Sequence, residues 1–289
     1  MHSNSSRAIK ILLLCMALML SACSMVRVAY NNGESLTYWW LDGYIDIEND
    51  QRPWVKERID RLFDWHRKTQ LRDYTRLLRD GQKRLQTGID KPTALADIAE
   101  MKKRLLVTLE AALPDLVDLA LDLRPEQLVR INKKFASLNS EYRKDYLRGD
   151  LEDRHKYRFK KILSQAEFWF GDFSREQEAQ IRKAVAAVPL DNDLYYRARL
   201  RRQRDLMTML TKIQSERPSR DATIAMLRTH LVAAVEQPGG TEYGAFFNTY
   251  YDGMAGVVFM IVNSATPAQK QHAHMKLQEF INDFSQLGG

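Results

Sequence analysis

Residues 55–85, VKERIDRLFDWHRKTQLRDYTRLLRDGQKRL, decide the fold class. Apolar side chains recur in this stretch at helical intervals, with Arg, Lys and Asp between them. They are Val55, Ile59, Leu62, Phe63, Tyr74, Leu77, Leu78 and Leu85. This spacing places the apolar groups on one face of an α-helix. The stretch therefore predicts a long amphipathic helix, and Pro53 suits its first turn.

The same helical pattern extends along the rest of the chain. A second helix is expected from about Pro92, with Pro114 breaking or restarting it, and Gly171 ends a later one at Phe170. Further helices are expected at about 125–148, 175–188, 192–215, 220–236, 242–264 and 267–286. Pro and Gly residues separate the later helices. We predict an all-α fold: a multi-helix bundle of about eight or nine amphipathic helices over residues 47–289.

The composition agrees with this fold class. Only 13 Gly and 8 Pro occur in 289 residues, which disfavours an all-β protein with its frequent turns. Hydrophobic residues are 45% and charged residues 28%, as in ordinary globular domains, and the net charge is +7. Residues 243–265 carry one charge, Asp252, but Gly and Asn interrupt them. We expect this segment in the centre of a large bundle rather than across a membrane.

The N-terminus has the features of a secretory signal. Arg7 and Lys10 precede an apolar run, Ile11 to Leu20, which is too short to span a bilayer. The next residues, Leu20-Ser21-Ala22-Cys23, resemble the lipobox of bacterial lipoproteins. That resemblance implies removal of residues 1–22 and attachment of diacylglycerol and an N-acyl chain such as palmitate to Cys23. No other cofactor is expected.

The residue after the lipobox bears on localisation. Ser24 rather than Asp follows Cys23. By resemblance to enteric lipoproteins, this favours the inner leaflet of the outer membrane, facing the periplasm, over the inner membrane. Residues 23–46 then form an aromatic tether that contains Tyr30, Tyr38, Trp39, Trp40 and Tyr44. These rings could form a membrane-interface belt, but packing on the helical domain is the favoured interpretation.

Four expected helix starts share one arrangement that ends in Gln. They are Ile47–Gln51, Leu123–Gln127, Phe173–Gln177 and Ala265–Gln269. Ser174 with Gln177, and Thr266 with Gln269, can form capping boxes, whereas Glu48 and Arg124 are poor caps. These segments resemble the LTxxQ signature of small periplasmic stress chaperones, which are all-helical and bind unfolded envelope proteins.

A second resemblance covers more of the chain. The lipobox continues as Cys23-Ser24-Met25-Val26-Arg27 and is followed by three further matching segments. They are Ala29-Tyr30-Asn31-Asn32, Tyr38-Trp39-Trp40-Leu41-Asp42-Gly43-Tyr44 and Gln51-Arg52-Pro53. Together they are similar to the uncharacterised Gram-negative lipoproteins of domain-of-unknown-function family 6279. This implies an envelope lipoprotein of helical fold, and it supplies no catalytic or binding residue.

The candidate sites are few. A cluster of five arginines is a candidate contact for anionic lipid, because guanidinium pairs well with phosphate. It comprises Arg197, Arg199, Arg201, Arg202 and Arg204. His272 and His274, two apart on a helix, point in different directions and cannot chelate together, so no metal site is predicted. Asp115, Asp118 and Asp122 share a helix face that we expect to be solvated, and no catalytic residue is predicted.

These observations favour a non-enzymatic protein attached to the membrane by lipid. The leading expectation is a periplasm-facing binding, assembly or chaperone-like protein whose partner is an envelope protein or a nonnative client. One alternative is a carrier of lipid or another hydrophobic ligand, which requires a large apolar cavity among the late helices. A peptidoglycan-active enzyme is the least favoured alternative. The expected compartment excludes nucleic acid.

Overall fold

The computed structural model describes residues 25–238 and 240–289, and these form helices and no strand. In chain order the helices are α2 (Met25–Asn31), α3 (Gly33–Ile45), α4 (Arg52–Thr69), α5 (Leu71–Thr87), α6 (Lys91–Asp122), α7 (Pro125–Tyr146), α8 (Leu151–Phe170), α9 (Arg175–Ala187), α10 (Asn192–Glu216), α11 (Arg220–Glu236), α12 (Gly240–Ser264) and α13 (Pro267–Leu287). The all-α prediction is confirmed, with more helices than the eight or nine expected.

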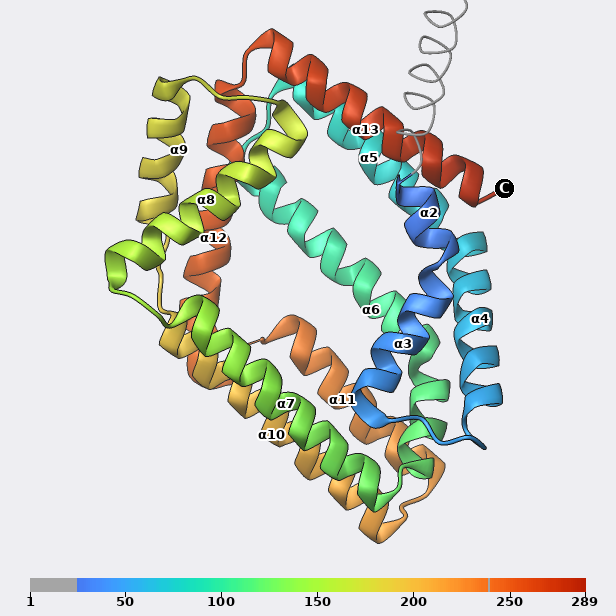
Figure 1. Ribbon diagram of the computed structural model, residues 1–289. Helices are drawn as coiled ribbons and strands as arrows, with labels where there is room; N and C mark the ends of the chain where they lie inside the picture. Colours follow the sequence, from blue (N-terminus) through green and yellow to red (C-terminus); the bar gives the residue numbers. More distant parts are fainter. Residues whose placement is uncertain (1–24, 239) are drawn as a thin grey trace, which may run out of the picture.

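The helices form an open, four-sided frame (Figure 1). Pairs of packed helices make its sides: α5 with α13, α7 with α10, α9 with α12, and α3 with α4. The long helix α6 runs across the middle of the frame and packs against α11 and α12. A helix in such a frame has neighbours on only part of its circumference. Apolar side chains on its remaining surface can therefore stay accessible to solvent.

The buried apolar side chains divide into two separate cores. The first core joins α3, α4, α7, α10, α11 and the second half of α6, and its most buried members are Ile45, Ile47, Val55, Leu113, Val117, Ala120, Leu123, Ile131 and Ile213. The second core joins α8, α9, α12 and α13, and includes Phe159, Phe170, Phe173, Ile181, Val185, Val257 and Ala273. Helices α5 and α6 run between the two cores and separate them (Figure 1).

Two helix boundaries differ from the prediction. The expected helix through residues 55–85 is divided at Gln70 into α4 and α5. The Thr69 hydroxyl donates to the Trp65 carbonyl 2.7 Å away, a contact that bends helices. Conversely, α6 continues through Pro114. Loss of a helical hydrogen bond at Pro costs about 3 kcal/mol, and the fully buried neighbours Leu113 and Val117 offset it.

The segment expected as an aromatic tether is part of the folded domain. Residues 25–45 form α2 and α3, and Ile45 and Ile47 lie in the first core. Tyr38, Leu41 and Tyr44 pack against that core. Trp39 and Trp40 point away and are 74% and 63% exposed. The packing interpretation therefore holds for the tyrosines and not for the tryptophans. The predicted signal peptide 1–22 and the lipidation residue Cys23 lie outside the described residues.

Helix α12 is not at the centre of a bundle, as its composition had suggested. It lies along one side of the frame (Figure 1), with Phe247, Ala255, Val257, Ile261 and Val262 buried. Within the described residues, the stretch 220–264 is the one place long and apolar enough to cross a membrane by length and composition alone. In the most apolar 18 residues of this stretch, only 28% of the residues are buried. Much of this apolar surface is therefore accessible.

Candidate functional site

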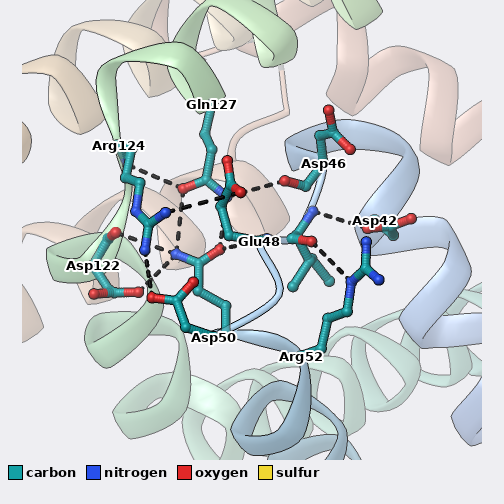
Figure 2. Close-up of polar contacts among 10 residues, drawn as sticks. Asp42, Asp46, Glu48, Asp50, Arg52, Asp122, Arg124 and Gln127 are labelled. Atoms are coloured by element: carbon teal, nitrogen blue, oxygen red, sulfur yellow. Dashed lines mark hydrogen bonds and ion pairs between the residues drawn. The ribbon is translucent and has the colours of Figure 1, made fainter.

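The four Gln-ending helix starts form two reciprocal pairs. Gln51 meets Gln127, and Gln177 meets Gln269. In the first pair Gln127 Nε2 donates to Gln51 Oε1 over 2.8 Å, and both side chains are fully buried, at 1% and 0% exposed (Figure 2). In the second pair the amides exchange hydrogen bonds of 2.8 and 3.0 Å. We call these pairs the glutamine locks.

Both locks have the same hydrogen-bond pattern. Each Oε1 accepts from the backbone N–H three residues earlier, at Glu48, Arg124, Ser174 and Thr266. Each Nε2 reaches across to the partner segment and donates to a backbone carbonyl, at Asp122, Asp46, Ser264 and Asp172. A Gln amide has one acceptor and two donors. It can therefore accept from its own helix start and, at the same time, donate to the partner segment.

The predicted capping boxes are confirmed at Ser174–Gln177 and Thr266–Gln269. Arg124 and Glu48 lack a capping hydroxyl, and their helix starts are stabilised across the first lock instead. Arg124 forms an ion pair with Asp50, and Gln51 Nε2 donates to the Asp122 carboxylate over 2.7 Å (Figure 2). The residues before the caps, Ile47, Leu123, Phe173 and Ala265, are all buried, so each lock is anchored in one of the two cores.

The five arginines from Arg197 to Arg204 do not form one free cationic surface. Arg199 is half-buried, donates to Asn139 Oδ1 over 2.8 Å and lies over the Tyr142 ring. Arg202 donates to the Pro238 carbonyl, and burial lowers its pKa. Arg201 pairs with Asp205. Only Arg197 and Arg204 are exposed without a partner among the described residues. The cluster mainly joins α10 to α7 and to the start of α12.

The three carboxylates on α6 also have intramolecular partners. Arg58 contacts Asp115 and Asp118, Arg220 pairs with Asp118 at 2.9 Å, and Asp122 accepts from Gln51. These contacts attach α4 and α11 to α6, so this face is not simply solvated. The described residues contain no group of three or more His, Cys, Asp or Glu placed to hold a metal ion.

Two apolar hollows open to solvent lie along α12. The first, the α6/α12 hollow, has a volume of about 740 Å³ and is lined by Ile98, Met101, Leu105, Tyr251 and Val258, with His66 and Tyr74 from α4 and α5. The second, the α8/α12 hollow, measures about 480 Å³ and is lined by Ile162, Trp169, Met254, Val257 and Val258. Val258 lies in both walls. The two hollows are therefore adjacent parts of one apolar surface.

Polar groups at the edge of this surface are sparse but defined. The Tyr30 hydroxyl lies 2.9 Å from His66 Nδ1, and the His66 ring lies between Tyr30 and Tyr74. Burial lowers the pKa of His66 and raises the pKa of Tyr30 to about 12, so both groups are uncharged at neutral pH. Lys102 and Lys161 supply positive charge at the two hollows, and Asp97, which pairs with Arg84, also lines the first. The surface suits an apolar ligand with a polar end.

No direct signal in the sequence marks these lining residues as part of a site. Met101 and Val258 occur at helical core spacing, yet they are 56% and 43% exposed. Their exposure follows from the open frame, because no further helix of the described part of the chain covers that side of α6 and α12. In the sequence, the unusually apolar composition of residues 243–265 was the one available indication of an apolar surface here.

The fold and these surfaces define an all-helical protein with two cores, two glutamine locks and an open apolar face. The family of unknown function DUF6279 matches residues 43–229, and the chain belongs to this family. The match covers both segments of the first lock and ends within α11. No curated protein and no solved structure matched the chain.

Proposed function

We propose that this protein is a chaperone-like or assembly protein of the cell envelope that holds apolar segments of a client or partner protein. The observation that supports this proposal most is the apolar surface formed by the α6/α12 and α8/α12 hollows. Both volumes fall in the range of about 300–1,000 Å³ that is typical of ligand sites. Exposed apolar surface of this kind marks an interaction site.

The open geometry favours a polypeptide as the occupant. A segment of a longer client chain can enter only a site that is open to solvent along its length. Both hollows are open along α12 rather than enclosed. Met101 and Met254 line them, and Met adapts to side chains of different shape. The resemblance of the helix starts to the LTxxQ signature agrees with this activity. In this protein the four Gln residues are structural and lie in the locks. The apolar surface formed by the two hollows, which we call the client surface, is a separate feature.

A second candidate is a carrier of lipid or another hydrophobic ligand. It is favoured by the same adjacent hollows, which provide the apolar space among the late helices that such a carrier requires. Lipid extracted from the purified protein in a fixed ratio, and lost on Val258→Asp, would support the carrier over the chaperone-like protein. A peptidoglycan-active enzyme has less support, because Asp115 and Asp118 are engaged by arginines.

We also propose that Cys23 carries the lipid anchor and that the domain faces the periplasm from the outer membrane. The lipobox supports this proposal, and α2 begins at Met25, two residues after Cys23. Cys23→Ala should abolish labelling with radioactive palmitate and release or misprocess the protein. Normal labelling of this variant would refute the anchor without affecting the proposed client surface.

The client surface is tested by placing a charge at Val258, which lines both hollows. Val258→Asp puts a carboxylate between the two hollows, whereas Val129→Asp changes another exposed Val, on α7, that lines neither hollow. The assay is suppression of aggregation of a urea-unfolded outer-membrane protein after dilution. We expect Val258→Asp to reduce suppression at least tenfold and Val129→Asp to leave it unchanged. Equal activity of both variants would contradict the proposal.

A further inference from the structure

A stripe of positive charge follows one face of α5 and the end of α4. It consists of Lys68, Arg72, Arg76, Arg79 and Lys83. Their spacings of four, four, three and four residues place them on one helical face. All five side chains are exposed. We call this set the α5 basic stripe.

Most of the charge on this stripe is not neutralised within the molecule. Lys68, Arg72 and Arg79 make no ion pair or hydrogen bond with any described residue. The two acids on this part of α5 already have partners: Asp73 contacts Arg104 and Arg76, and Asp80 lies 3.4 Å from Lys83. The stripe therefore keeps a net positive charge that is available to an external anion.

The stripe also borders a wide hollow. A space of about 740 Å³ extends along Lys68, Arg72, Arg76, Arg79 and Lys83 and is closed on one side by the last turn of α13 and the two glycines that follow it. Unlike the hollows on α12, this one is lined mainly by charged and polar groups, in which the five cations outnumber the two carboxylates, Asp73 and Asp80. It has room for phosphate headgroups beside the guanidiniums, which bind phosphate in a bidentate geometry.

The position of the stripe identifies the source of the phosphate. Helix α13 packs against both α5 and α2, and Arg27 of α2 pairs with Asp283 of α13 over 3.0 Å. The start of α2 thus lies beside the same end of α13 that borders the hollow (Figure 1). The chain before α2 contains Cys23, so any attachment there brings this end of the molecule to a bilayer. The arginines from Arg197 to Arg204 have no such proximity in the fold.

We infer that the α5 basic stripe contacts the anionic headgroups of the membrane surface next to which the protein is held. The contact would fix how the frame sits on the bilayer, independently of what the α12 hollows bind. It adds electrostatic attraction to any anchor at Cys23. The choice of a membrane as the source of phosphate rests on the lipid attachment proposed for Cys23.

The test compares two triple variants of the full chain that remove the same charge. One carries Lys68→Gln, Arg72→Gln and Arg79→Gln. The other carries Lys183→Gln, Arg197→Gln and Arg204→Gln, which are also exposed and without partners among the described residues. Flotation measures partitioning onto phosphatidylcholine vesicles with and without 30% phosphatidylglycerol. Partitioning onto vesicles with phosphatidylglycerol is divided by partitioning onto vesicles without it. This ratio removes the contribution of the N-terminal segment, which is identical in all variants.

We expect the stripe variant to lower this ratio roughly 100-fold, since each cation near an anionic surface contributes about a fivefold factor. The control variant should lower it less than threefold. Urea unfolding checks that both variants are folded, which is expected because none of the six side chains has a hydrogen-bond or ion-pair partner within 25–238 and 240–289. Equal losses in both variants would show nonspecific attraction, and no loss in the stripe variant would show that the stripe does not contact the membrane. Either result would overturn the inference.

Discussion

At the scale of single residues, the four lock glutamines have the largest structural effect. Each one accepts from a backbone N–H of its own helix start through Oε1 and donates through Nε2 to the partner Gln and to a backbone carbonyl of the partner segment. Because the first lock is fully buried, a missing amide leaves backbone groups without partners. An unsatisfied buried polar group costs about 1–3 kcal/mol. A residue of similar volume without the amide should therefore destabilise the protein without creating a cavity.

We predict that Gln51→Leu and Gln127→Leu each lower the free energy of unfolding by about 2 kcal/mol. The double variant should lose less than the sum, with a coupling energy of about 0.5–3 kcal/mol, since the two amides bond to each other. Urea denaturation followed by circular dichroism provides the values.

Gln180→Leu, at an exposed position of α9, is the control and should change stability by less than about 0.5 kcal/mol. Strict additivity of the Gln51 and Gln127 variants would show that the hydrogen bonds between the two amides contribute no stability.

The lock residues could be found in the sequence, but their pairing could not. The capping pattern is local, and it correctly identified Gln177 and Gln269 as members of capping boxes. The partners in each lock are 76 and 92 residues apart. Their contact depends on which helix ends the fold brings together. The spare N–H groups of the four amides were the only indication in the sequence that a partner was required.

At the scale of helices, local signals predicted boundaries well wherever Pro, Gly or a capping residue ends an element. The expected helix at 192–215 agrees with α10, and the expected helix at 267–286 agrees with α13. The failures at Gln70 and Pro114 have different causes. At Gln70 no Pro or Gly marks the bend, and the Thr69 hydroxyl bonds back to the Trp65 carbonyl. At Pro114 the burial of Leu113 and Val117 outweighs the local preference of Pro, and this outcome depends on tertiary packing.

The junction of α8 and α9 permits a test at this scale. Arg158 of α8 is half-buried and donates to the carbonyls of Val185, Val188 and Pro189 at 2.6, 2.8 and 2.9 Å. It therefore stabilises the C-terminal end of α9, where the last carbonyls have no helical partner. We predict that Arg158→Gln lowers the free energy of unfolding by about 2–4 kcal/mol.

Two further variants make this prediction specific. Lys160→Gln, exposed on the same helix and without a partner among the described residues, should have almost no effect. Arg158→Lys should lie between the two, because one ammonium cannot match the fork of the guanidinium. Denaturation midpoints measure all three variants. Equal midpoints for Arg158→Gln and Lys160→Gln would show that Arg158 does not stabilise the end of α9.

At the scale of the whole molecule, the division into two cores explains the accessible apolar surface. Each core forms at one lock, and α5 and α6 span the distance between them. Among the residues that the structure describes, no third layer then covers the interior faces of α6 and α12. From the sequence, an all-helical chain with an unusually apolar late helix was predictable. The open arrangement was not, because helical periodicity does not distinguish a core-facing stripe from one that lines a hollow.

The central claim is that the apolar surface on α12 and α6 binds apolar segments of other envelope proteins. The most direct measurement is photo-crosslinking in cells, with a photoreactive residue at Met101 in the α6/α12 hollow or at Val129 on α7, and identification of the adducts by mass spectrometry. The two positions are 56% and 53% exposed. We predict adducts to envelope proteins at Met101 and few at Val129. Equal adduct yields at both positions, or adducts to lipid alone at Met101, would contradict the claim.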